Sequence, residues 1–221
     1  MSRVSSSCLM APSFQFPKQL PGMILPGCHL IPHNGLPLYV FEEHYREMLS
    51  EVLDTHRMFF VAEAVSEEMA EELGGVATGR AGVFAAPFAG LGMARVCLQN
   101  EDGTSHLILQ GLKRIRILDF DAAFSYPMAS IATVETALGD SKTLAAARRK
   151  IEERVEKLDG ECAGLRTDLL EGLQGAEQIE VWTDMMGARL LRSSEVLRSF
   201  LAMDSLEGRL ELLWSSINRM P

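Results

Sequence analysis

The clearest pattern of hydrophobic and polar positions lies between residues 105 and 120. Apolar side chains occupy alternate positions there, with polar side chains between them: Leu107, Leu109, Ile115 and Ile117. A period of two residues is typical of a β-strand with one buried face. Gly111 interrupts the pattern, and a glycine inside a strand commonly marks a bulge or a tight bend. We therefore predict two strands that meet at Gly111.

A hairpin turn precedes this stretch. Asp102 and Gly103 tolerate the positive φ that a tight turn requires, and residues 92–99 before them are predicted to form the partner strand. Residues 58–62 and 128–134 have the composition of two further strands. A long hairpin that bends at a glycine allows a small antiparallel sheet to curl toward closure.

One helix is expected among these strands, near residues 41–56, where apolar side chains recur every three or four positions. The segment before it, residues 17–37, is rich in proline, which excludes a helix there. We therefore assign residues 18–138 to a β-rich barrel lobe that contains this one helix.

The pattern changes at Gly139. Asp140 or Ser141 is typical of a helix N-cap, and apolar side chains recur at helical spacing beyond them. Interruptions are expected at Gly160 and Gly164.

The last helix is predicted to begin at Asp204, because Glu207 follows three residues later in the arrangement of a capping box. Residues 139–221 therefore form a helical lobe. Strands first and helices afterwards indicate an α+β fold with two lobes.

Charge and cysteine usage restrict the partners and the compartment. The net charge is −9, which argues against nucleic acid as a partner, because phosphate binding needs clustered Lys and Arg. The four cysteines are far apart and form no Cys-x-x-Cys pair: Cys8, Cys28, Cys97 and Cys162. This usage is typical of reduced thiols in a cytoplasmic protein.

Residues 1–17 are predicted to form a flexible tail. The first 41 residues contain no Asp or Glu, so an organelle transit peptide stays open as the alternative. No run of about 18 apolar residues occurs, and we expect no membrane partner.

Two segments have some features of cofactor or metal sites. Residues 74–81 have the glycine spacing of a phosphate-binding loop, but Arg80 and Ala81 stand where Lys and Ser or Thr are needed. Three potential zinc ligands lie close together: Cys28, His29 and His33. No second pair of ligands follows them. We therefore expect neither a cofactor nor a metal.

Short motifs recur along the chain in a fixed order. They are Leu25-Pro26, Leu36-Pro-Leu-Tyr-Val-Phe-Glu42, Gly92-Met-Ala-Arg-Val96, Asp102-Gly103, Leu109-Gln-Gly-Leu-Lys-Arg-Ile-Arg-Ile117, Tyr126-Pro127 and Phe200-Leu-Ala-Met-Asp-Ser-Leu-Glu-Gly-Arg-Leu-Glu-Leu-Leu213. Together they resemble the amino-terminal domain of the Lon (La) ATP-dependent proteases, over roughly residues 18–218. The resemblance implies a twisted, partly closed antiparallel β-barrel lobe of the PUA-like kind, followed by a helical lobe.

The resemblance also implies a function. Nothing in the sequence resembles the ATPase module or the serine motif of Lon proteases, so we expect a free-standing member of the family that is not an enzyme. Its expected role is that of a non-catalytic protein-binding module for unfolded or tagged clients, or of an adaptor for a proteolysis machine. Client proteins or peptides are the expected partners, and self-association is compatible with this role.

The alternative function is RNA binding by the barrel lobe. Lys113, Arg114 and Arg116 form a basic cluster, and barrels of related fold bind RNA. No aromatic side chains interleave with the cluster, so we interpret it instead as a solvated strand face.

A client site is proposed from residues 81–91, a segment with few polar side chains. Its glycines and proline predict a surface loop, and exposed apolar loops commonly bind partners. The proposed client-binding residues are Phe84, Phe88 and Leu91. In the alternative, the two phenylalanines fold back into the seam between the lobes.

Overall fold

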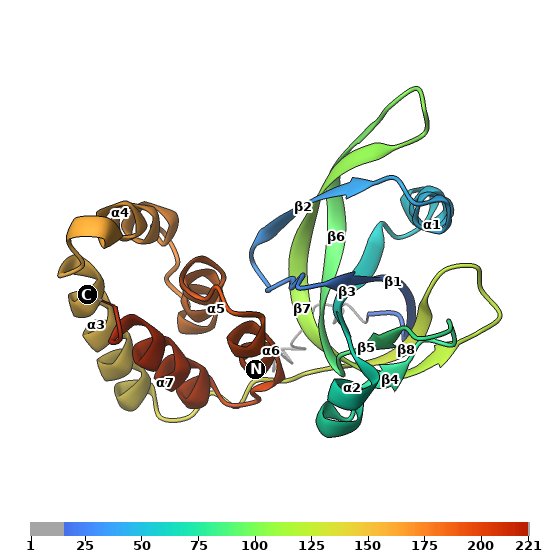
Figure 1. Ribbon diagram of the computed structural model, residues 1–221. Helices are drawn as coiled ribbons and strands as arrows, with labels where there is room; N and C mark the ends of the chain where they lie inside the picture. The colour runs from blue at the N-terminus through green and yellow to red at the C-terminus, as the bar shows by residue number, and fades with distance from the viewer. Residues whose placement is uncertain (1–15, 221) are drawn as a thin grey trace, which may run out of the picture.

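The computed structural model describes residues 16–220, which form a β-rich lobe followed by a helical lobe (Figure 1). The predicted α+β class, with a partly closed barrel before a set of helices, is confirmed. Most of the predicted tail, residues 1–15, lies outside the described residues. None of the helices in the described part is long and apolar enough to cross a membrane.

Five strands close the barrel. Hydrogen bonding follows the order β1, β8, β7, β6, β3, and β1 then pairs in parallel with β3 to complete the ring. Their bounds are β1 Gln19–Pro26, β3 Met58–Val65, β6 Phe88–Gln99, β7 Ser105–Asp121 and β8 Met128–Thr133. Three strands lie outside this ring: β2 Gly35–Val40, β4 Val76–Ala77 and β5 Phe84–Ala85.

The prediction of two strands meeting at Gly111 is wrong in one respect. β7 is a single strand of 17 residues, because β6 runs beside most of its length. The predicted bulge is present: Leu91 pairs with Lys113 and Gly92 with Gly111, which leaves Leu112 unpaired. A Cβ atom on Gly111 would overlap the carbonyl oxygen of Ile31, so the crossing of the β1–β2 connection requires glycine there.

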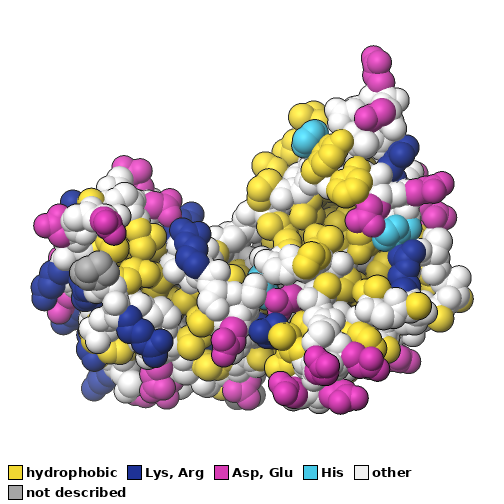
Figure 2. All heavy atoms as spheres, in the orientation of Figure 1, with side chains coloured by type: hydrophobic (Ala, Val, Ile, Leu, Met, Phe, Trp, Pro, Cys, Tyr) yellow, Lys and Arg dark blue, Asp and Glu magenta, His cyan; other side chains and the backbone are white. Residues whose placement is uncertain are grey.

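The ends of β6 and β7 extend beyond the barrel together with β2. We call these three strands, over residues 35–40, 94–99 and 105–110, the arm. β7 lies in the middle, paired with β2 on one side and β6 on the other. In the space-filling view the surface is hollowed between the arm and the helical lobe (Figure 2).

Two helices belong to the β-rich lobe, where the sequence predicted one. Helix α1 Glu43–Asp54 lies within the predicted range. Helix α2 Glu67–Leu73 is short, and the side chain of Ser66 caps it by accepting a hydrogen bond from the amide of Met69.

The second lobe contains the remaining helices of the described part. They are α3 Ser141–Glu156, the 3₁₀ turn η1 Gly160–Cys162, α4 Ala163–Gly172, α5 Ile179–Leu190, α6 Ser194–Ala202 and α7 Leu206–Ile217. The strands end at Thr133 and α3 begins at Ser141, so the proposed lobe boundary at residue 139 falls in the connection.

The predicted helix starts are right for α3 and wrong by one residue for α7. Asp140 caps α3, since its carboxylate accepts a hydrogen bond from the amide of Thr143 at 2.8 Å. α7 is capped by Ser205 and not by Asp204. Glu207 does not complete a capping box, because its Oε1 instead accepts a hydrogen bond from the amide of Asp140.

The lobes share an apolar seam. Ile31, in the β1–β2 connection, is buried in the core of the helical lobe, and Phe88 of β6 packs against that core. The other apolar clusters belong to the barrel lobe, one inside the barrel and one between the arm and α1.

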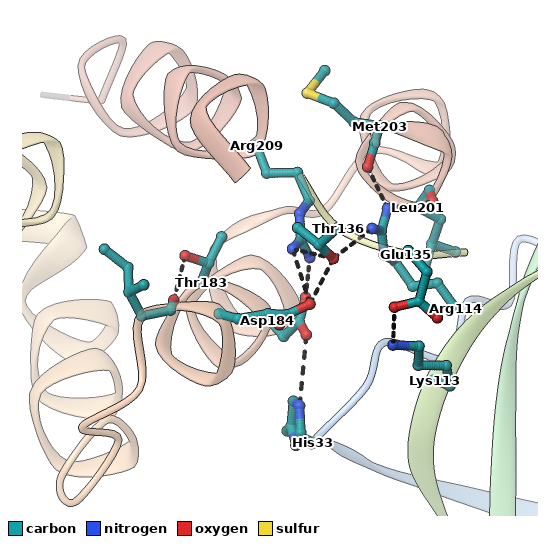
Figure 3. A network of polar contacts seen from close by, with 12 residues as sticks. His33, Lys113, Arg114, Glu135, Thr136, Thr183, Asp184, Leu201, Met203 and Arg209 are labelled. Atoms are coloured by element: carbon teal, nitrogen blue, oxygen red, sulfur yellow. Dashed lines mark hydrogen bonds and ion pairs between the residues drawn. The ribbon is translucent and has the colours of Figure 1, made fainter. Parts of the chain in front are cut away.

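Arg114 of β7 crosses the seam (Figure 3). Its side chain is 2% exposed and donates hydrogen bonds to the carbonyl oxygens of Leu201, at 3.0 Å, and Met203. It also donates to the hydroxyl of Thr136 at 2.9 Å. Burial lowers the pKa of Arg114 to about 10. A cation from the sheet thus satisfies carbonyl groups at the end of α6, which fixes that helix against the barrel.

A buried ion pair lies beside it (Figure 3). Arg209 of α7 is fully buried and donates to the carboxylate of Asp184 in α5. Nε2 of His33, from the barrel lobe, lies 3.8 Å from the same carboxylate. Burial raises the pKa of Asp184 to about 6, although Arg209 and Arg114 act in the opposite direction.

Replacing Arg209 by methionine would leave the Asp184 carboxylate buried without its main partner. We expect the free energy of unfolding to fall by about 3–5 kcal/mol, because an uncompensated buried charge is costly. Urea denaturation measures this. The matched control Arg116→Met, at an exposed position of β7, should change the free energy by less than about 0.5 kcal/mol.

The double variant Arg209→Met with Asp184→Leu separates charge from packing. It should recover much of the loss, because both buried charges are then removed. A double variant as unstable as the single one would show that the packing of Arg209, and not its charge, stabilises the seam.

Candidate functional site

The structure places the proposed client-binding residues on strands, so the predicted surface loop is wrong. Phe84 lies in β5, which pairs with β3, while Phe88 and Leu91 lie in β6. Leu91 is fully buried in the barrel core and is not accessible to a partner. Phe88 packs in the seam, as the alternative expected. Client binding by Phe84 and Phe88 stays a prediction.

The basic cluster does not form a basic surface. Arg114 is buried in the seam, and Nζ of Lys113 lies 3.3 Å from the carboxylate of Glu135. Only Arg116 of the three cations is exposed. The interpretation as a solvated strand face is therefore wrong for Arg114, because the helical lobe covers the side of β7 that alternation alone assigns to water. This removes the central cation from the RNA-binding alternative.

The potential zinc ligands face different partners. Nε2 of His29 lies 3.7 Å from the carboxylate of Glu63, whereas His33 faces Asp184. Glu63 also pairs with Arg198 of α6 at 2.7 Å, which makes a second polar link across the seam. Burial lowers the pKa of His29 to about 4 and raises that of Glu63. Within residues 16–220, no group of three or more His, Cys, Asp or Glu side chains could hold a metal ion.

A different surface stands out, on the arm. Register places Pro37, Ile108 and Val96 in one row across β2, β7 and β6. The next row consists of Tyr39, His106 and Leu98. Alternate residues share a face of a sheet, so these six side chains lie on one side. We call this side the arm face.

The arm face is apolar and exposed. Leu98 is 65% exposed, Val96 and Tyr39 are each 50% exposed, and Ile108 is 45% exposed. The ring of Tyr39 stacks on His106 at a centroid distance of 4.6 Å and on Phe41, the next aromatic residue, at 5.8 Å. Hydrophobic side chains gather over the arm in the space-filling view (Figure 2).

The opposite side of the arm explains why this exposure is unusual. Its apolar side chains belong to the cluster that packs against α1, with Leu107 and Leu109 buried and the others partly buried: Leu36, Leu38, Cys97, Leu107 and Leu109. An antiparallel sheet with one packed face commonly presents polar residues on the other. The arm is apolar on both sides, so its exposed side is not needed to bury a core. Contiguous exposed apolar patches of this kind mark interaction sites.

A signal for the arm face was present in the sequence. Residues 36–41 form an almost unbroken apolar run, so the residues on both faces of this strand are apolar. The period-two interpretation of Leu107 and Leu109 identified the buried side of β7 but passed over Ile108 between them.

Comparisons with known proteins agree with this architecture. A family model described as the ATP-dependent protease La (LON) substrate-binding domain matches residues 19–219. Comparison with curated proteins yields no match.

Two solved structures are similar in fold. The N-terminal domain of the Mycobacterium avium complex Lon protease has a TM-score of 0.65 at 13% identity, covering 91% of this chain and 99% of that chain. A Lon N-terminal domain protein from Xanthomonas campestris has a TM-score of 0.60 at 20% identity, covering 92% and 99%.

The two faces of the arm should respond differently to truncation. Leu98→Ala, on the arm face, should change the free energy of unfolding by less than about 0.5 kcal/mol, because little buried surface is lost. Leu107→Ala, on the packed face, should reduce it by about 2–5 kcal/mol, because it leaves a cavity. Urea denaturation compares them. Equal losses would mean that Leu98 is part of the core.

Proposed function

Because the chain belongs to the family of Lon substrate-binding domains, we propose that it binds client proteins through the arm face. The observation that supports this proposal most directly is the exposure of an apolar sheet face that the fold does not use. Burial of apolar surface is the main favourable term in protein association, and the arm face offers such surface to a partner.

The chemistry of the arm face favours non-native clients. Folded proteins bury most of their large apolar side chains, so an apolar segment long enough to cover two rows of the arm is exposed mainly when a protein is unfolded or damaged. Tyr39 supplies a wide aromatic surface with a polar hydroxyl, which is typical of residues that concentrate binding energy. Leu98 and Val96 extend this surface toward the edge of the sheet.

The proposal assigns no catalysis to the chain. The buried charged groups of the described residues serve the seam, together with the half-buried Arg198: Arg114, Arg209, Asp184 and Glu63. They hold the helical lobe against the barrel, and the arm projects away from that lobe (Figure 1). A partner can therefore reach the arm face without separating the lobes.

The test uses a permanently unfolded probe, reduced and carboxymethylated lactalbumin, with binding measured by isothermal titration calorimetry. The double variant Tyr39→Ser with Leu98→Ser should bind at least about tenfold more weakly, because two anchors of the arm face are lost. Its melting temperature should stay close to that of the original chain.

Leu118→Ser is the matched control. Leu118 is also on β7 and is 54% exposed, but it lies outside the arm. The Leu118→Ser variant should bind the probe as tightly as the original chain does. Equal weakening by the control would point to general surface hydrophobicity, and unchanged binding by the double variant would refute the arm face as the site.

A further inference from the structure

We infer that a client segment binds the arm by adding a strand to the free edge of β6, at Val96–Gln99. This inference rests on the proposed function and specifies its geometry. The occupant is an extended stretch of a non-native protein with apolar side chains at alternate positions. Its backbone pairs with β6, and its side chains enlarge the arm face.

The edge is free in the described part of the chain. β6 pairs with β7 along one side as far as Gln99. On its other side, β3 pairs with β6 only over Gly90–Met93, and the amide of Ala94 makes one last hydrogen bond to the carbonyl of Arg57. Beyond Ala94, no other described strand pairs with this side of β6.

Free edges leave backbone groups without partners. In an antiparallel pair, alternate residues direct their N–H and C=O groups away from the neighbouring strand. Half of these groups at Val96–Gln99 therefore point outward, as a template for one more strand. The opposite edge of the arm is less suitable, because β2 carries Pro37, which has no amide hydrogen to donate.

The side chains of an added strand would continue the rows already present. A new strand lies about 4.8 Å from its neighbour, so every second residue would stand beside Val96 or Leu98. The row of Pro37, Ile108 and Val96 and the row of Tyr39, His106 and Leu98 would each gain one member. Backbone pairing and apolar contact are thus satisfied by the same segment.

The two ends of the edge differ in charge. Exposed Glu101 and Asp102 lie at the hairpin tip, next to Gln99. Exposed Arg95 lies at the other end, where the register of β6 shifts against β7. The occupant that fits has a basic residue near the tip and an acidic residue near Arg95, with the apolar positions between them.

The experiment uses a short synthetic peptide with valine at alternate positions, serine between them, lysine at one end and glutamate at the other. One derivative is N-methylated at the valines and a second at the serines. The amides of each set share one edge of an extended peptide, so only one set can pair with β6. The protein itself is unchanged, which excludes misfolding as a cause.

We expect one derivative to bind about tenfold more weakly than the parent peptide or worse, because it loses several backbone hydrogen bonds. The other should bind within about twofold of the parent. Amide hydrogen exchange followed by NMR should slow within Val96–Gln99 when the parent peptide binds, and stay unchanged in β2.

The other outcomes distinguish a failure of strand addition from a failure of the proposed function. Equal binding by both derivatives would show a peptide lying on the arm face without backbone pairing, with the proposed function intact. Binding of unfolded lactalbumin but not of the peptide would also overturn strand addition alone. A dimer in sedimentation that the peptide dissociates would show that a second copy occupies the edge. Failure to bind either probe would refute the proposed function itself.

Discussion

β7 pairs with β2, β6 and β8 along its 17 residues, and this continuity constrains the other parts of the molecule. Its first half forms the middle of the arm, and its second half closes the barrel. Between them, the bulge at Leu112 lets Gly111 pass beneath the β1–β2 connection while Arg114 reaches the helical lobe. A break in β7 would uncouple the arm, the barrel and the seam at once.

The seam is held by charges in a place where charges are costly. Arg114, Arg209 and Asp184 are each at most 2% exposed, and removing such groups from water offsets much of their mutual attraction. Their geometry, however, is specific: the two guanidinium groups donate to named carboxylate, hydroxyl and carbonyl oxygens, although Nε of Arg209 has no partner among the described residues. We therefore expect the network to define the orientation of the lobes more than it adds to stability.

Sequence patterns predicted the helices and strands better than they predicted which of their faces other elements cover. Alternation along β7 and the cap at Asp140 depend on neighbouring residues, and both are found in the structure. The burial of Arg114 depends on a helix almost ninety positions later, which no local pattern reports. The same limit explains the arm face, since alternation cannot tell whether a second layer covers Leu98. The interruption expected at Gly164 is not found, because Gly164 lies within the first turn of α4.

An exposed apolar sheet with a free edge invites aggregation, so the arm needs features that keep copies apart. Pro37 blocks one edge, the shift at Arg95 twists the base of the other, and the hairpin tip is acidic. The net charge of −9 adds repulsion between whole molecules. The acidic tips repel each other when two arms pair in parallel, and the net charge opposes association in either direction, although an antiparallel pairing would bring Arg95 near the tip of the other copy. A client segment with a basic end is attracted to the acidic tip. The same charges that limit self-association would then favour a particular kind of client.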